Sequence, residues 1–211
     1  MRCGAVSLDG LLALPDAPAA MVLFAHGSGS SRLSPRNTQL ANALHADGFG
    51  TLLMDLLTPL EDLDPNTRFD IALLTRRLAC GADWLGEEAS TAALPLGVFG
   101  ASTGAAAALR LAAMPDAAVA ALALRGGRTD LAGAAELAKV HAPTLFIVGA
   151  LDELVVAINR ISYLALPAEK ELAIIAGASH LFEEPGKLDE VALLAGRWFT
   201  RHLADAARRG A

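Results

Sequence analysis

The sequence predicts an α/β fold in which helices cover both faces of a mostly parallel sheet. Short apolar runs alternate with helix-like segments along the chain, and each run ends in glycine or in a polar cluster. Several runs are apolar throughout, as strands buried on both faces of a sheet require. A chain of 211 residues fits one domain with a sizeable core. We therefore predict a single domain over residues 1–211 with about seven or eight strands.

The first third of the chain combines three strands with one helix. We expect an opening strand or hairpin at 5–14 around Asp9-Gly10, a central strand at 19–27 and a further strand at 51–57. Between the last two strands, Ser34 can cap a helix and Pro35 fits its first position. Gly48 ends this helix, whose apolar face holds Leu40, Ala43 and Leu44.

The remaining elements keep the alternation. A helix at 67–86 shows the helical period through four apolar residues, Phe69, Leu73, Leu74 and Leu78. We expect strands at 94–100, 117–124, 143–152 and 171–179, and helices at about 103–113, 131–138, 155–166 and 188–206. The alanine runs lie within these helices, where alanine has the highest propensity.

The composition argues against several classes of partner. Asp and Glu number 23 against 17 Lys and Arg, so the chain carries a formal charge of −6 and lacks the basic surface that nucleic-acid binding needs. No apolar run reaches the roughly 18 residues of a membrane-spanning helix, and Asp9 and Gly10 interrupt the region where an export signal would lie. We expect a cytoplasmic protein with no nucleic-acid or membrane partner, in which Cys3 and Cys80 stay reduced.

The motif Gly100-Ala101-Ser102-Thr103-Gly104 closes a predicted strand and opens a helix. In a G-x-S-x-G motif, a sharp turn at this junction exposes the serine hydroxyl above the sheet, and the glycines admit neighbouring backbone. The first N–H groups of the following helix suit a developing oxyanion. The pattern alone also fits a tight turn with a capping serine, so the presence of catalytic partners must decide between the two interpretations.

An acid and a base follow in the expected order. Asp152 ends the run "LFIVGALD", and His180 follows the next predicted strand in "LAIIAGASHLF". Because the carboxyl ends of parallel strands share one edge of the sheet, the loops after these strands converge with Ser102. In the predicted triad, His180 takes the proton of Ser102 and Asp152 orients His180. Taken singly, Asp152 could instead cap a helix, and His180 could be a loop residue with a local role.

The glycine-rich loop "FAHGSGSS" (24–31) ends a strand upstream of the motif. Gly27 and Gly29 let the backbone turn so that the Ser28 N–H joins the Thr103 N–H as an oxyanion donor, while His26 braces the loop. A dinucleotide-binding G-x-G-x-x-G is the alternative, but an arginine stands where its third glycine belongs, and the lysine of a P-loop is missing. That alternative also leaves the predicted triad unexplained.

These four segments resemble the α/β-hydrolase superfamily over nearly the whole chain. Within it, the chain is similar to the compact, lidless dienelactone-hydrolase-like proteins, some of which are fused to phosphoribosyltransferase domains. The resemblance implies a serine esterase that forms an acyl-enzyme on a small ester or lactone, without a metal or an organic cofactor. Dienelactone hydrolase itself uses a cysteine nucleophile where this chain has Ser102, so we expect ordinary ester chemistry. Only 18 residues separate Leu124 from Pro143, where lids are often inserted in this fold, so we expect an open site with no cap domain.

Arginines gather near the same edge of the predicted sheet, at Arg32, Arg36, Arg125 and Arg128. A guanidinium presents a planar fork to carboxylates or phosphates. Arg36, Arg125 and Arg128 are therefore candidates for binding an acidic group of the substrate. Alternatively, these side chains hold loops in place by pairing with protein carboxylates, such as Asp55, Asp130 or Glu183.

Other functions are compatible with the same constellation. A hydrolase-like module could bind a small molecule or a partner without catalysis, and an acyltransferase or a C–C bond hydrolase could use the same triad. The sequence does not separate these from an esterase. We expect a monomer or a homodimer.

Overall fold

The computed structural model of the protein describes residues 1–209, and the side chains of residues 1–203. Its strands are β1 (Arg2–Cys3), β2 (Val6–Ser7), β3 (Gly10–Ala13), β4 (Met21–Ala25), β5 (Gly50–Met54), β6 (Leu96–Ala101), β7 (Val119–Arg125), β8 (Thr144–Gly149) and β9 (Lys170–Ile175). Its α-helices are α1 (Pro35–Ala46), α2 (Ile71–Glu87), α3 (Thr103–Ala112), α4 (Ala134–Leu137), α5 (Glu153–Ala165) and α6 (Lys187–Arg209). Three short 3₁₀ helices are η1 (Glu61–Leu63), η2 (Thr67–Phe69) and η3 (Thr129–Ala132).

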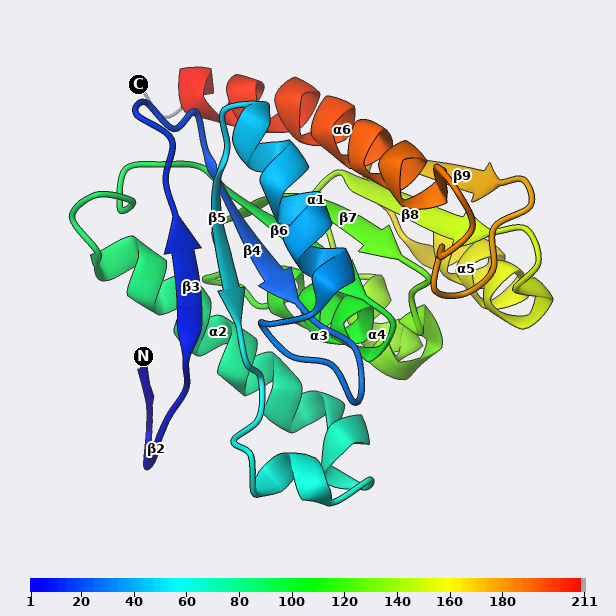
Figure 1. The fold of residues 1–211 in the computed structure, drawn as a ribbon, viewed down its shortest axis with the longest axis horizontal. Coiled ribbons are helices and arrows are strands. Elements are labelled where there is room, and N and C mark those ends of the chain that lie inside the picture. The colour runs from blue at the N-terminus through cyan, green and yellow to red at the C-terminus, as the bar shows by residue number, and fades with distance from the viewer. Residues whose placement is uncertain (210–211) are drawn as a thin grey trace.

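A seven-stranded sheet forms the centre of the molecule, in the order β3-β5-β4-β6-β7-β8-β9 (Figure 1). β3 pairs antiparallel with β5, and every other neighbouring pair in this sheet is parallel. The predicted fold class is therefore confirmed. Between β7 and β8 the chain forms only η3 and α4, so no cap domain covers the carboxyl edge of the described sheet.

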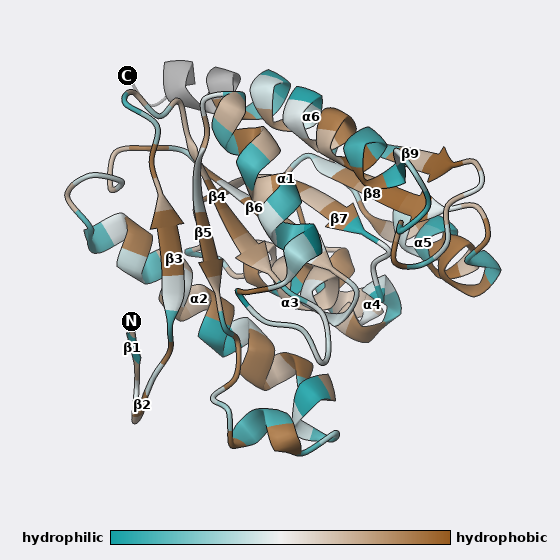
Figure 2. Cartoon of the chain, in the orientation of Figure 1, coloured by the Kyte–Doolittle hydropathy of each residue, from teal (hydrophilic) through white to brown (hydrophobic). Residues whose placement is uncertain are grey.

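Helices cover both faces of the sheet, with α1 and α6 on one face and α2 and α3 on the other (Figure 1). The central strands are strongly hydrophobic along their length (Figure 2). All five residues of β4 are buried, and successive side chains enter opposite layers: Leu23 packs with the α2 and α3 layer, whereas Val22 and Phe24 pack with α1 and α6. This two-sided burial explains why the strand is apolar throughout.

The first helix begins and ends as predicted. The Ser34 hydroxyl accepts a hydrogen bond from the Asn37 N–H at 3.4 Å, and Pro35 occupies the first turn. Gly48 takes a φ of +89° just after the helix, a conformation that favours glycine. Leu40 and Leu44 are buried, which places this helix firmly on the sheet.

Two local predictions need correction. The strand expected within 5–14 is present as β3, but the hairpin alternative around Asp9-Gly10 is wrong, because the opening hairpin pairs β1 with β2 and turns at Gly4, where φ is +64°. The helix predicted at 67–86 begins at Ile71, because the Asp70 carboxylate accepts the Leu73 N–H and starts a new helix there. Phe69 consequently precedes the helix and is 51% exposed, rather than forming part of the buried face.

The expectation that the two cysteines stay reduced is also wrong. Cys3 and Cys80 are joined by a disulfide, with their Cα atoms 5.8 Å apart. The β1–β2 hairpin brings Cys3 against α2, and the Arg77 guanidinium donates to the Cys3 carbonyl at 3.0 Å. The bond therefore ties the N-terminal hairpin to α2 across a separation of 77 residues.

Candidate active site

Ser102 lies at a tight junction between β6 and α3. Its φ of +50° and ψ of −118° are unusual for a residue with a side chain. A Cβ at Gly104 would lie 2.1 Å from the Ala25 carbonyl oxygen, and one at Gly100 would lie 2.7 Å from the Ala105 Cα. Both glycines of the motif are thus required by neighbouring backbone, and this packing holds Ser102 in its strained conformation.

Asp152 and His180, the predicted acid and base, meet at the carboxyl edge of the sheet. His180 Nδ1 lies 2.5 Å from Asp152 Oδ2. Asp152 directly precedes α5, yet its side chain makes no capping hydrogen bond to that helix. Its carboxylate faces the imidazole instead, so the alternative role of a helix cap is not what the geometry shows. With the proton on Nδ1 donated to Asp152, Nε2 of His180 is the nitrogen able to accept a proton.

The loop that carries His180 is held by its own contacts. Both carboxylate oxygens of Glu184 accept the Ser179 N–H at 3.1 Å, and the hydrogen bond to Ser179 lowers the pKa of Glu184. Phe182 takes a φ of +58° while its ring is 1% exposed. Burial of this ring anchors the loop, and the His180 side chain remains 39% exposed at the surface.

The glycine-rich loop after β4 packs directly against Ser102. A Cβ at Gly27 would lie 2.9 Å from the Ser102 Cβ, so any larger residue would collide with the serine. Ser28 and Thr103 both line a narrow crevice together with Gly27. Among the described residues, no acceptor is found for the N–H of Ser28 or of Thr103. The two predicted oxyanion donors therefore lie on either side of this contact, Thr103 directly after Ser102 and Ser28 directly after Gly27.

His26 braces this loop as a neutral imidazole. Its Nε2 accepts the Leu56 N–H at 3.0 Å, so the proton lies on Nδ1, which donates to the Gly27 carbonyl at 2.9 Å. Burial lowers the pKa of His26, whose side chain is 6% exposed. His26 therefore links the end of β4, the segment that follows β5 and the loop that carries Ser28.

Three of the four arginines form ion pairs within the protein. Arg32 binds Asp55, Arg36 binds Glu183 at 2.7 Å, and Arg128 binds Asp130 at 2.8 Å. These are the carboxylates named by the alternative in which the arginines hold loops in place. In this structure Arg36 and Arg128 are engaged in that way.

Arg125, at the end of β7, differs from the other arginines. Its side chain is buried, and Nε and Nη1 have no hydrogen-bond partner among the described residues. Burial, together with the nearby charge of Arg36, lowers the pKa of Arg125 to about 10. The Arg125 carbonyl accepts the Ser102 N–H at 3.1 Å. The residue with the unpaired guanidinium is therefore hydrogen-bonded to the serine backbone.

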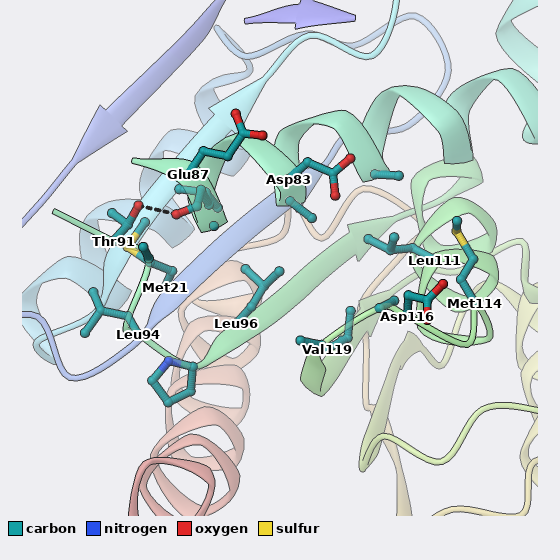
Figure 3. Close-up of a pocket in the computed structure, with 18 residues that line it drawn as sticks. Met21, Asp83, Glu87, Thr91, Leu94, Leu96, Leu111, Met114, Asp116 and Val119 are labelled. Carbon is teal, nitrogen blue, oxygen red and sulfur yellow. Dashed lines mark hydrogen bonds between the residues drawn. The ribbon is translucent and has the colours of Figure 1, made fainter. Parts of the chain in front are cut away.

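An apolar pocket beside α2 lies away from these residues. It measures about 590 Å³ and is found at the amino ends of β4, β6 and β7, the edge opposite Ser102. Figure 3 shows an apolar lining that includes Leu96 and Leu111, with carboxylates at Asp83, Glu87 and Asp116. None of the predicted site residues lines it.

Within the residues whose side chains are described, no three His, Cys, Asp or Glu residues are grouped as metal ligands, and no helix is long and apolar enough to cross a membrane.

The family follows from a match to a sequence model. The model described as "Alpha/beta hydrolase domain" matches residues 18–193, which include Ser28, Ser102, Asp152 and His180. The chain belongs to the alpha/beta hydrolase family. This is the superfamily that the four sequence segments resemble, and the sheet order and the serine at the β6–α3 junction agree with it.

Solved structures are similar to the chain over nearly its full length. A dienelactone hydrolase from Anabaena variabilis is 50% identical, with a TM-score of 0.92 over 96% of this chain and 95% of that one. Est1E from Butyrivibrio proteoclasticus shares the fold at 13% identity, with a TM-score of 0.81 over 95% of this chain and 96% of that one. The chain is therefore a dienelactone-hydrolase-like member of the alpha/beta hydrolase family.

Longer relatives occur in Mycobacterium tuberculosis. A protein of strain H37Rv named "Putative phosphoribosyl transferase Rv0571c" is 49% identical over 207 residues, which are 98% of this chain and 46% of that protein. A protein of strain CDC 1551 named "Putative phosphoribosyl transferase MT0597" matches equally well. The chain spans about half the length of these curated relatives.

Proposed function

We propose that the protein is a serine hydrolase that cleaves small esters or lactones. The observation that carries the proposal is the orientation of Asp152, whose carboxylate faces His180 rather than capping α5. This orientation is what a histidine needs in order to act as a base toward a neighbouring serine. The strained conformation of Ser102, which packs against the Gly27 loop, gives the proposed nucleophile its position.

The proposed reaction has two halves. In the first, His180 Nε2 takes the Ser102 proton as the serine oxygen attacks the ester carbonyl carbon, and the Ser28 and Thr103 N–H groups donate to the resulting oxyanion. The carbon–alkoxide bond then breaks, and His180 returns the proton to the leaving alcohol. In the second half, water gives a proton to His180 as its oxygen attacks the acyl carbon. The bond between that carbon and the Ser102 oxygen then breaks, His180 returns the proton to the serine oxygen, and the acid is released. Asp152 holds the imidazole tautomer throughout.

The relatives support the coarser part of this proposal. The Anabaena variabilis protein, at 50% identity, is named a dienelactone hydrolase, which acts on an ester bond within a ring. The Mycobacterium tuberculosis relatives carry a transferase name, but more than half of their length lies outside the match. We therefore assign the ester chemistry to the alpha/beta hydrolase unit, with the glycine-rich loop after β4 supplying the Ser28 N–H as one of the two oxyanion donors.

Hydrolysis of 4-nitrophenyl acetate tests this function. We expect the wild-type chain to release 4-nitrophenol, and Ser102→Ala to lower kcat by at least about a thousandfold. Ser90→Ala is the matched control, because Ser90 is an exposed serine in the connection between α2 and β6. Equal turnover by wild type and Ser102→Ala would contradict the nucleophile assignment, and absence of turnover by wild type would favour a non-catalytic binding module.

We further propose that Arg125, rather than Arg36 or Arg128, interacts with an acidic group of the substrate. Arg36 and Arg128 already bind Glu183 and Asp130, whereas Arg125 has no carboxylate partner among the described residues. A 4-nitrophenyl hemisuccinate carries a carboxylate that 4-nitrophenyl acetate lacks. We expect Arg125→Met to reduce kcat/KM for the hemisuccinate about tenfold more than for the acetate, since a charged hydrogen bond is lost. An equal reduction for both esters would contradict this role.

A further inference from the structure

The turn that follows β7 holds Ser102 from both sides. The Ser102 N–H donates to the Arg125 carbonyl at 3.1 Å, and the Arg128 N–H donates to the Ser102 carbonyl at 3.0 Å. Both backbone groups of the strained serine are therefore bound by the segment 125–128. The position of the serine hydroxyl depends on where this segment lies, because the two hydrogen bonds fix the peptide planes on either side of the Ser102 Cα.

The same turn lies beneath the proposed base. Gly126 takes a φ of +53°, and a Cβ at this position would lie 3.4 Å from both Cε1 and Nδ1 of His180. The Gly126 N–H donates to the Ile147 carbonyl at 2.8 Å, which fastens one end of the turn to β8. One short segment thus contacts the backbone of Ser102 and the ring of His180.

Asn159 fastens the other end of this turn. Its side chain is fully buried, with 0% of its surface exposed. The amide nitrogen donates to two carbonyls at 2.8 Å, those of Gly127 in the turn and Val155 within α5. The helix that contains Asn159 begins immediately after Asp152, so the amide connects the helix that follows the acid to the turn that touches the serine and the histidine.

We propose that Asn159 is a positioning residue for the reaction, and this inference rests on the proposed function. By holding the Gly127 carbonyl, it keeps segment 125–128 in register with Ser102 and His180. If Asn159 had a purely structural role, removing its side chain would have the same effect as removing another buried hydrogen bond between α5 and the same region. Ser162 provides that comparison, because its hydroxyl donates to Thr129 Oγ1 at 2.7 Å one turn later on α5, beyond the segment that contacts Ser102.

Two substitutions separate the two donor contacts of Asn159. Asn159→Ala removes both hydrogen bonds. Asn159→Ser retains a short donor that can reach the Val155 carbonyl four residues earlier, but it is too short to reach Gly127. Ser162→Ala is the matched control, because it removes a buried hydrogen bond from the same helix without touching the turn.

The first measurement is amide hydrogen exchange at Ser102 and Arg128, which does not depend on any turnover. We expect exchange at both amides to accelerate about fivefold or more in Asn159→Ala and Asn159→Ser, and to stay at the wild-type rate in Ser162→Ala. Unchanged exchange in the Asn159 variants would overturn the inference, because the turn would then be held without the amide.

The second measurement is the kinetics of 4-nitrophenyl acetate hydrolysis. We expect both Asn159 variants to lose kcat by roughly 10- to 100-fold, as for misplacement of a reacting group, while KM stays within about threefold. Ser162→Ala should keep kcat within about threefold. Equal losses in the Asn159 and Ser162 variants, or no loss in any of them, would overturn the positioning role. A wild-type chain without turnover would contradict the proposed function, and the exchange rates would still decide whether Asn159 holds the turn.

Discussion

Replacing Arg125 with methionine should make the protein more stable. Burial and the charge of Arg36 lower the pKa of Arg125 well below its ordinary value, to about 10. This shift corresponds to a cost of about 3 kcal/mol for holding the charged form in the folded state. Below pH 10 the guanidinium is charged in both the folded and the unfolded chain, so this cost is present at neutral pH. Methionine keeps an apolar side chain of similar length in place of the arginine stem.

Urea denaturation at neutral pH measures this effect. We expect Arg125→Met to raise the free energy of unfolding by about 2–3 kcal/mol. Arg128→Met is the matched control, because Arg128 lies on the same turn but is partly exposed and paired with Asp130. This control should change the free energy of unfolding by less than about 0.5 kcal/mol.

The opposite result would refute the reasoning. If Arg125→Met lost about 1 kcal/mol or more, the guanidinium would be stabilising the fold rather than straining it. An arginine kept at a cost in stability fits the proposed interaction with an acidic substrate group, because binding sites retain groups that folding alone would not favour. The stability measurement and the comparison of the two esters therefore test one idea through independent quantities.

Three further outcomes are expected. Ser102→Gly should have a free energy of unfolding about 1 kcal/mol higher than that of Ser102→Ala, because glycine tolerates the φ of +50°. Urea denaturation of the two variants measures this difference. Equal stability would mean that the turn is not strained. Replacing both Cys3 and Cys80 with serine should lower the free energy of unfolding by about 2–4 kcal/mol, since the disulfide closes a long loop. An unchanged urea midpoint would show that the bond adds no stability. Burial lowers the pKa of His26 below 6.5 in the folded chain. As the pH falls just below 6.5, the unfolded chain therefore binds a proton at His26 while the folded chain does not. The free energy of unfolding decreases in this range as a result. A His26→Gln variant should lose this part of the pH dependence, and a slope equal to that of wild type between neutral pH and pH 5 would contradict the role of burial.

Much of the site is predictable because it depends on local sequence and on one property of parallel sheets. Ser102 lies between glycines at a strand end, and Asp152 and His180 follow later strands. The shared carboxyl edge brings such residues together, whatever the detailed packing of the helices. The start of α1 was equally local, since a capping serine followed by proline specifies a helix start within two residues.

Features that depend on distant packing could not be predicted in the same way. The Cys3–Cys80 bond requires the N-terminal hairpin to lie on α2, 77 residues away in the chain. The sequence predicts four arginines near one edge of the sheet. Only the packing of the folded chain shows that Arg125 is the one without a carboxylate partner among the described residues. Asn159 was missed because nothing in its local sequence marks it. The glycine pair at Gly126 and Gly127 was the one available signal for the turn that it holds.

The identity of the nucleophile can be measured without knowing the natural substrate. Incubation with a fluorophosphonate probe, followed by peptide mass spectrometry, locates the modified residue in the wild-type chain. We expect a single adduct on Ser102, formed at a rate that falls at least about a hundredfold in His180→Ala, because the serine is a weak nucleophile without its base. A folded wild-type chain that forms no adduct, or an adduct on another residue, would contradict the assignment of Ser102 as the nucleophile.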